Sequence, residues 1–323
     1  MNKSIFVLLA AAFIYSCSDH DHNSIEPAPS HPDLISPELD DATNVTTKSP
    51  FTGSLEVFPC NEGSSIYFGN YYNNVLTPID PQYTVKDGTG SFSTIPLLVP
   101  IGTYNIIYWG MPKETEEIYP DMSIQEPPLR LNANLAQTYF SLRKHPHIKD
   151  TIYYPVYNYV HAVVPTNIGT DKLSASLQRV VAGINVTISG KDGGEFDTNV
   201  ESVQVLIGNI AEKLDVFSAT PSNQTKTVQF PLTLSADGKQ MSVPTVMLFP
   251  SAPNPPIQII ITLKNGAVKT YKQNLTTTLN ANTKLSLSMT LNEIFSSEST
   301  TGDFNVSNWN EKNESIDLPP IGG

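Results

Sequence analysis

The sequence has only two cysteines, Cys17 and Cys60, in 323 residues. Because Cys17 is assigned another role below, no intramolecular disulfide is expected, and stability must come from packed apolar faces. Cys60 stands near Glu62, whereas a reactive thiol needs a base and electropositive surroundings. We therefore interpret Cys60 as a structural residue rather than a catalytic nucleophile.

Positive charge is also scarce. The chain has 19 Lys and Arg against 31 Asp and Glu, a net charge of −12. Nucleic acids and anionic membranes are bound through basic surfaces, which release counterions or meet phosphates. We therefore expect neither a nucleic acid nor an anionic membrane surface as a partner, and we interpret the acidity as a source of solubility.

Motifs for catalysis and metal binding are missing as well. The sequence has no Gly-x-Ser-x-Gly, no His-Glu-x-x-His and no phosphate-binding glycine loop. His145 and His147 flank Pro146 in a loop composition, residues 192–197 lack the spacing of a calcium loop, and His20-Asp21-His22 lies in a polar tail. We expect no enzyme, no cofactor and no metal site.

The apolar run over residues 5–14 is too short to remain as a membrane-spanning helix. With Lys3 before it and the small residue Ser16 after it, this run predicts a secretory signal over residues 1–16. Ile14-Tyr15-Ser16-Cys17 resembles the bacterial lipobox, in which lipid is attached to the cysteine thiol. The alternative is a plain signal peptide with an incidental cysteine.

A lipidated Cys17 predicts a protein held to a membrane by acyl chains, because each buried methylene contributes about 0.8 kcal/mol. The next residues, Ser18-Asp19-His20-Asp21-His22, resemble the signal that sends Bacteroidetes lipoproteins to the outer face of the outer membrane. The expected location is therefore the cell outer membrane, lipid-anchored and exposed at the surface.

The remaining chain has the pattern of an all-β protein. Residues 17–44 are polar and poor in apolar residues, which predicts a disordered spacer. Beyond it, apolar and polar residues alternate in short runs, most clearly over residues 183–188 and 285–291. We expect an N-terminal β-domain over residues 45–165 and a C-terminal β-domain over residues 166–323.

Local turn chemistry predicts individual hairpins. Asn265-Gly266 joins two apolar runs and suits a two-residue turn with positive φ at both positions, and Asp237-Gly238 and Asp87-Gly88 are similar. Residues 173–181 have apolar residues at helical spacing, so they form either a helix or the start of the strand that begins near Gly183.

Four segments, in this order, carry a family resemblance: Pro100-Ile101-Gly102-Thr103-Tyr104, residues 177–186 (Leu-x-Arg-x-x-Ala-x-Ile-x-Val), residues 279–287 (Leu-x-Ala-Asn-x-x-x-x-Leu), and residues 304–309, which end in Trp309. They resemble motifs of the fimbrillin superfamily of the Bacteroidales, the subunits of type V pili. Gly183 departs from the family, which often has Lys there. We expect Trp309 to be buried in the second domain.

This resemblance implies two transthyretin-like β-sandwich domains in tandem and a role in cell adhesion as part of a fimbrium. It implies other pilus subunits as partners, joined by β-strand addition, in which main-chain hydrogen bonds give affinity and alternate side chains give register. Ile316 and Leu318 alternate in Ile316-Asp317-Leu318 and are the strand-exchange candidates, although Pro319 and Pro320 limit the strand. A frayed tail is the alternative for this segment.

The resemblance also bears on the position in the pilus. Stalk subunits of that family are trimmed after an arginine beyond the first strand, which opens a groove for the neighbour's strand. Here the first arginine is Arg130, so residues 17–90 do not offer that cut, although Lys48 could serve a lysine-specific protease. We therefore predict an untrimmed anchor or another accessory or tip subunit.

The competing hypothesis is a surface lipoprotein that binds glycans, because exposed aromatic faces stack on sugar rings. The tyrosines in question are Tyr71, Tyr72, Tyr153, Tyr154, Tyr157 and Tyr159. If Tyr153, Tyr157 and Tyr159 alternate into a core instead, this reading loses its basis. A host or microbial surface ligand stays open, and Asp150-Thr151-Ile152 resembles the Bacteroidetes O-glycosylation acceptor, with Thr151 as the candidate site.

Overall fold

The computed structural model describes residues 32–45, 47–146, 151–190, 193–196 and 198–290. Residues 34–323 form a compact unit separate from residues 1–33, and the description below concerns the former unit. The lipidation candidate Cys17, the strand-exchange candidates Ile316 and Leu318, and Trp309 lie outside the described residues.

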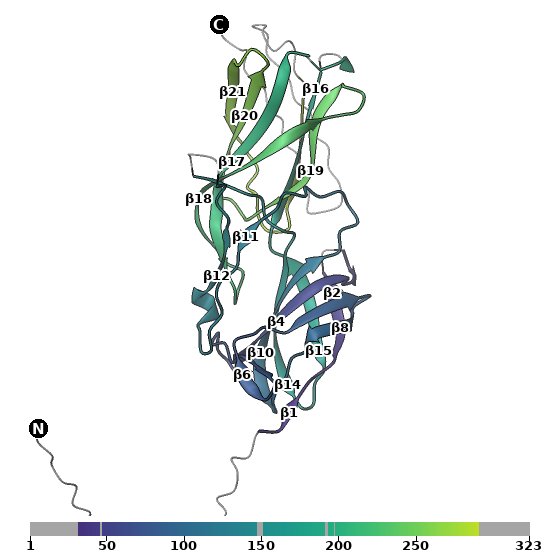
Figure 1. Ribbon diagram of the computed structural model, residues 1–323, viewed down its shortest axis with the longest axis vertical. Coiled ribbons are helices and arrows are strands. Elements are labelled where there is room, and N and C mark those ends of the chain that lie inside the picture. The colour runs from purple at the N-terminus through teal and green to yellow at the C-terminus, as the bar shows by residue number, and fades with distance from the viewer. Residues whose placement is uncertain (1–31, 46, 147–150, 191–192, 197, 291–323) are drawn as a thin grey trace, which may run out of the picture. The chain divides into compact units, whose positions relative to one another are not determined.

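One sheet has eight strands: β2 (Leu39–Asn44), β3 (Ser49–Pro50), β4 (Gly53–Asn61), β7 (Gln82–Lys86), β8 (Thr89–Ile95), β10 (Gly102–Pro112), β14 (Val160–Ile168) and β15 (Leu173–Arg179). Their order is β3-β2-β15-β14-β10-β4-β7-β8 (Figure 1). The Ala42 N–H of β2 donates to the carbonyl of Gly88, in the turn between β7 and β8, at 2.7 Å. The sheet therefore curls back toward its own start.

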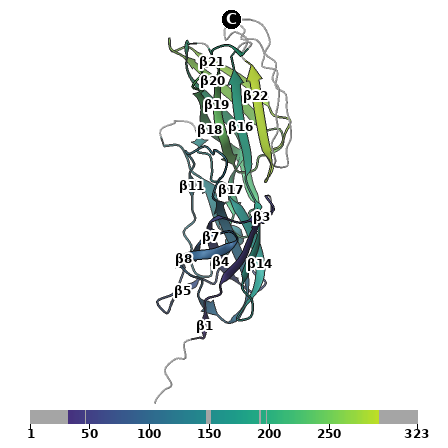
Figure 2. The same ribbon diagram turned by 90° about the vertical axis from the view of Figure 1, so that its right-hand side faces the viewer.

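A second sheet has ten strands: β11 (Ile124–Gln125), β12 (Tyr139–Leu142), β13 (Ile152–Tyr153), β16 (Ala182–Ser189), β17 (Val200–Asp215), β18 (Pro221–Leu234), β19 (Gln240–Leu248), β20 (Pro256–Leu263), β21 (Val268–Asn274) and β22 (Lys284–Thr290). The main order is β11-β12-β17-β18-β19-β16-β22, with β13 beside β18 and β20 joining β17 to β21 (Figure 2). Two small ladders pair β1 (Leu34–Ile35) with β9 (Val99–Pro100) and β5 (Asn70–Tyr72) with β6 (Val75–Thr77).

The all-β fold class is confirmed, since the helical element named within the described residues is a single 3-10 turn, η1 (Leu135–Gln137). Residues 173–179, for which the sequence allowed either a helix or a strand, form β15. Leu173, Ala175 and Leu177 point into the core while the intervening residues are exposed, so the period of two decides against a helix.

All three hairpin predictions are confirmed, but the two-residue turn type holds only at Asp87-Gly88. At Asp237-Gly238 only Gly238 (φ 69°) has positive φ, and the Ser235 N–H bonds to the carbonyl of Gln240, which leaves a four-residue loop. Asp87 and Gly88 both have positive φ, 50° and 86°, and make the two-residue turn between β7 and β8. Between β20 and β21 the Leu263 N–H instead bonds to the carbonyl of Ala267, and at this turn only Gly266 (φ 81°) has positive φ. The loop therefore has three residues, a length that needs one left-handed glycine.

The spacer prediction is wrong for residues 34–44. Leu34–Ile35 forms β1, and Leu39–Asn44 forms β2 with Ala42 fully buried. The error has a physical reason: β2 pairs in parallel with β15, far away in the chain, so a short polar segment is ordered by a partner that its own composition does not reveal.

The strand pairing also differs from the expected division at residues 165–166. β14 runs through both residues, and β15 stays in the same sheet, so that sheet ends at Arg179. In addition, β11, β12 and β13 precede that point but pair within the second sheet. The sheets thus interleave along the chain, and a division into two tandem domains stays a prediction.

Two groups of buried residues form the core. The smaller one lies within the curl of the first sheet and includes Leu39, Ala42 and Leu173. The larger one holds the apolar residues of the second sheet and extends to Phe58, Ile107 and Trp109 of the first. Apolar packing thus continues from one sheet to the other.

Candidate subunit-assembly site

The place where strand exchange would act is occupied by the chain's own β2. This strand lies between β3 and β15, and the Val45 N–H donates to the carbonyl of Leu177 at 2.9 Å. Leu39 and Ala42 face the core of the first sheet. Removing β2 would therefore expose an apolar groove together with the main-chain groups of β15.

Both basic residues considered for proteolytic trimming are exposed, but they differ in what a cut would release. Lys48 lies in the turn between β2 and β3 with φ of 52°, so a cut there would free β1 and β2 alone. Arg130 lies after β4 and β10, so a cut there would separate most of the first sheet's strands from β14 and β15. Arg130 therefore does not suit removal of a single strand.

A polar network joins the first sheet to β22. The Asn158 side chain donates to the Glu114 carboxylate and accepts from Arg179 Nε at 2.8 Å. Two residues beyond Glu114, the Glu116 carboxylate accepts from Lys284 Nζ at 2.7 Å. Lys284 begins β22, so these contacts hold the start of the strand that precedes residues 291–323.

Burial changes the pKa values of the charged groups in this network. It raises the pKa of Glu114, an effect opposed by the Asn158 hydrogen bond and by the nearby Arg179 guanidinium. Burial also lowers the pKa of Arg179 to about 10, while Glu114 and Glu116 act in the opposite sense. Breaking a buried pair by removing one partner is costly, because the other charge stays in the interior. Of these groups only Lys284 lies on β22, and its ion pair with the exposed Glu116 is the contact that fixes the start of this strand.

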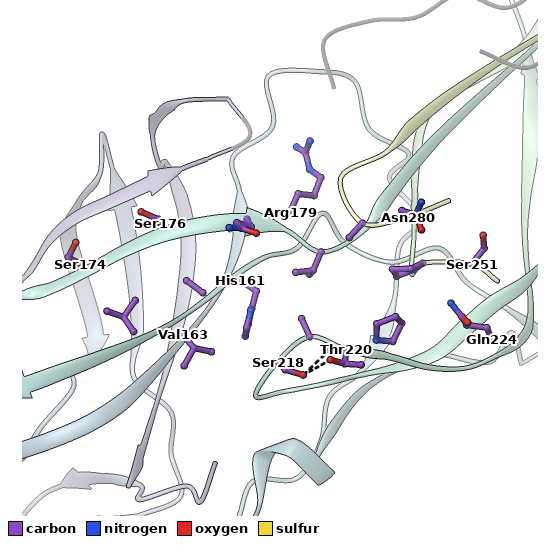
Figure 3. Close-up of a pocket in the computed structure, with 18 residues that line it drawn as sticks. His161, Val163, Ser174, Ser176, Arg179, Ser218, Thr220, Gln224, Ser251 and Asn280 are labelled. Atoms are coloured by element: carbon purple, nitrogen blue, oxygen red, sulfur yellow. Dashed lines mark hydrogen bonds between the residues drawn. The ribbon is translucent and has the colours of Figure 1, made fainter. Parts of the chain in front are cut away.

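Beside this network lies a groove of about 830 Å³ (Figure 3). The wall is mostly hydroxyl, amide and small apolar groups, from β14, β15, the turn that follows β17, the start of β18 and two further loops. The Arg179 guanidinium points away from Ser218 and Thr220. The groove is thus a largely neutral surface at the contact between the two sheets.

Ser218, His161 and Asp215 meet near this groove, but their geometry is not that of a catalytic triad. The Ser218 hydroxyl is hydrogen-bonded directly to the Asp215 carboxylate at 2.7 Å and to Thr220 at 2.6 Å. Within the described residues His161 Nε2 has no hydrogen-bond partner, and burial lowers the pKa of this imidazole to about 4. A triad needs the histidine between the other two groups.

Trp109 of β10 connects the first sheet to the turn after β17. It is 2% exposed, its indole N–H donates to the carbonyl of Val216 at 2.8 Å, and its ring packs edge-on against Phe140 and Tyr159. Glu56 of β4 is its cross-strand partner. A buried indole with a satisfied N–H gives both apolar contact and orientation.

Glu56 leads to a pH prediction. Burial, then Asp80 and Glu126, raise its pKa from 4.5 to about 7 in the folded protein. Because the folded state binds this proton more tightly, stability present below about pH 4.5 is lost as the pH rises toward 7. We expect Glu56→Gln to raise the free energy of unfolding by about 1–3 kcal/mol at pH 8 and to have little effect at pH 4.

Urea melts at both pH values measure this difference. Glu62→Gln, at the exposed position just after the same strand, is the matched control and should change stability by less than about 0.5 kcal/mol. An equal effect of Glu56→Gln at the two pH values would contradict the assignment.

The other residues singled out from the sequence are scattered. Tyr153 and Tyr159 are buried, Tyr154 and Tyr157 are half-buried, and Tyr72 is exposed on β5. The tyrosines of residues 153–159 therefore do not form an exposed aromatic platform. Thr151 is exposed just before β13, as an acceptor would be, but its glycosylation stays a prediction.

Cys60 is fully buried, and burial raises the pKa of its thiol to about 12. A thiol in this state is a poor nucleophile, because the thiolate is the reactive form.

Among the described residues, no group of three or more histidine, cysteine or acidic side chains is arranged to hold a metal ion. In the same part of the chain, no helix is long and apolar enough to cross a membrane.

The fold and this site define an all-β protein whose N-terminal strand β2 is built into its own first sheet. The family model described as "Fimbrillin-A associated anchor proteins Mfa1 and Mfa2" matches residues 34–315. The chain belongs to this family, which confirms the fimbrillin resemblance. The family is non-enzymatic in kind, and membership implies association with other fimbrial subunits and a location in the fimbrium at the cell surface.

Three solved structures are similar to the chain. The fimbrial anchor protein Mfa2 from Porphyromonas gingivalis has 12% identity over 80% of this chain and 89% of that chain, with a TM-score of 0.45. A candidate cell adhesion protein from Bacteroides uniformis has 13% identity over 81% and 93%, with a TM-score of 0.45. A candidate adhesin from Bacteroides ovatus has 12% identity over 85% and 90%, with a TM-score of 0.47.

Likenesses at such identities and TM-scores carry no argument about function. A comparison with curated protein sequences gives no match.

The Arg179 network was not predicted, although one signal for it exists. Leu173, Ala175, Leu177 and Arg179 occupy one face of a strand, which places a cation on an apolar face where it needs a buried partner. The identity of that partner has no local signal, because Glu114 and Asn158 lie on other segments.

Proposed function

We propose that the protein is the lipid-anchored base subunit of a fimbrium, which keeps its own first strand and gives its C-terminal segment to the next subunit. The observation that supports this most directly is the place of β2 between β3 and β15, in a chain of the anchor family. An accessory or tip position is the alternative within the same family.

Strand addition determines where such a subunit can stand in the fibre. A subunit whose groove holds its own strand can give a strand but cannot take one, so it ends the fibre. In this proposal Cys17 carries the acyl chains that hold the base to the outer membrane, and the absence of arginine before Arg130 leaves β2 in place.

The donor would be the segment with Ile316 and Leu318. Its two apolar side chains alternate around Asp317, as required for side chains that enter successive pockets of a groove. β22 pairs with β16 along its whole length, from Lys284 to Thr290, so the chain would leave for the donor segment from the end of a strand that is fixed in the second sheet.

Deleting residues 315–323 tests the donor. We expect fibres to be released from cells or not to form, because the base subunit loses the strand that the next subunit needs. Electron microscopy and the amount of major pilin that sediments with cells measure this. Deleting residues 319–323 alone is the matched control, since Ile316-Asp317-Leu318 is retained and attachment should persist. Fibres that stay attached after the longer deletion would rule out this segment as the donor.

A further inference from the structure

Exposed apolar side chains lie on the β5–β6 hairpin and just after β9, on two segments that a main-chain hydrogen bond links. Tyr72 is 47% exposed, Val75 61% and Ile101 58%, and Ile79 after β6 is also exposed. These are four of the seven large apolar residues that the structure describes as exposed. Tyr72 and Val75 are cross-strand partners beside the turn of the β5–β6 hairpin, whose Asn73 and Asn74 both have positive φ.

The hairpin is hydrogen-bonded to the segment just before β9 (Val99–Pro100). The Tyr71 N–H donates to the carbonyl of Leu98 at 2.9 Å, and the Asn70 side chain bonds to the backbone of Leu98 and Pro96. Ile101 directly follows β9. We call Tyr72, Val75 and Ile101 the apolar tip.

The N-terminal segment enters the first sheet at this same end. Leu34 and Ile35 of β1 pair with Pro100 and Val99 of β9, next to Ile101. Both views place β1 and the β5–β6 hairpin at the same end of the first sheet (Figure 1, Figure 2). The chain that leads back to Cys17 therefore joins the described structure beside the apolar tip.

The two segments that carry the tip are uncharged in an acidic protein. Residues 63–79 and 88–112 contain no Asp, Glu, Lys or Arg. A neutral apolar surface with a tyrosine suits the interface of a bilayer, where tyrosine is enriched and charge is costly. Such a contact needs no basic residues, so the net charge of −12 does not oppose it.

From these observations we propose that the apolar tip rests in the interfacial layer of the membrane to which Cys17 is anchored. This inference depends on the proposed lipid anchor. A flexible chain of the length of residues 18–33 spans about 20–25 Å on average, so it keeps the tip close to the bilayer surface. Tethering makes the contact intramolecular, and a patch too small to bind membranes alone can then engage. The contact would orient the base subunit.

The test uses the lipidated full-length protein with one added cysteine, labelled with an environment-sensitive fluorophore and reconstituted in phosphatidylcholine vesicles. Val75→Cys and Ile101→Cys report on the tip. Val268→Cys is the matched control, because Val268 also lies in a hairpin and is 57% exposed, but on β21 of the other sheet. Cys60 is buried and should not react.

We expect labels at residues 75 and 101 to be blue-shifted and quenched severalfold more by lipid-borne quenchers than the label at 268. Vesicle-bound protein with all three labels equally open to aqueous iodide would overturn the tip contact and leave the lipid anchor intact. Protein that does not bind vesicles would overturn the anchor and the inference with it. If the labels are protected from iodide only at high protein density and are not quenched by lipid-borne quenchers, the tip contacts a second copy of the protein. This result would contradict the membrane contact.

Discussion

Cys17→Ala is expected to abolish lipid labelling and to move the protein from the outer-membrane fraction to the soluble fraction. The reason is that the acyl chains on Cys17 are the proposed membrane anchor, and an apolar tip of three side chains cannot replace them. One acyl chain already gives only marginal binding, and stable attachment takes more than one such signal. Metabolic labelling with a fatty-acid analogue, followed by fractionation, measures both effects.

Ser18→Ala is the matched control, since it changes the neighbouring residue and leaves the thiol in place. Label that persists on Cys17→Ala would disprove the lipobox assignment. Intact mass of the wild-type protein adds a second criterion, because an untrimmed anchor must begin at Cys17. A mature N-terminus within residues 45–60 would instead make the protein a trimmed pilin.

Trp109→Ala is expected to lower the free energy of unfolding by about 3–5 kcal/mol, because truncating a large buried aromatic side chain removes its apolar contacts and leaves a cavity. Trp109 is 2% exposed and packs on Phe140 and Tyr159, so the cavity would open where the first sheet meets β12 and the turn after β17. Denaturant melts of the purified protein measure the change.

Two variants separate the causes. Trp109→Phe keeps a ring but leaves the carbonyl of Val216 without its donor, and should cost about 1–3 kcal/mol. Tyr72→Ala removes an exposed aromatic side chain and should cost less than about 0.5 kcal/mol in solution. A loss below about 1 kcal/mol for Trp109→Ala would mean that this contact between the sheets is peripheral.

Structural features that depend on residues close together in the sequence could be predicted from the sequence alone. The turns at Asp87-Gly88 and Asp237-Gly238 are local, because backbone conformation at a tight turn depends on the residues within it. The all-β class follows from side-chain alternation, which a strand imposes wherever one of its faces is buried. The anchor hypothesis needed only the absence of arginine before Arg130 and the family motifs.

The candidate site depended on contacts between distant segments. Leu39–Asn44 reads as part of a polar spacer, yet it is a strand within the first sheet, because Ala42 packs into the core and the strand pairs with β15. Likewise, Arg179 carries a local sign of burial, but only the fold brings Asn158 and Glu114 to it. Alternation and turn chemistry determined that this chain forms sheets. Which strands are neighbours was decided by the tertiary structure, because main-chain hydrogen bonds are the same for every sequence and only packing selects the partner.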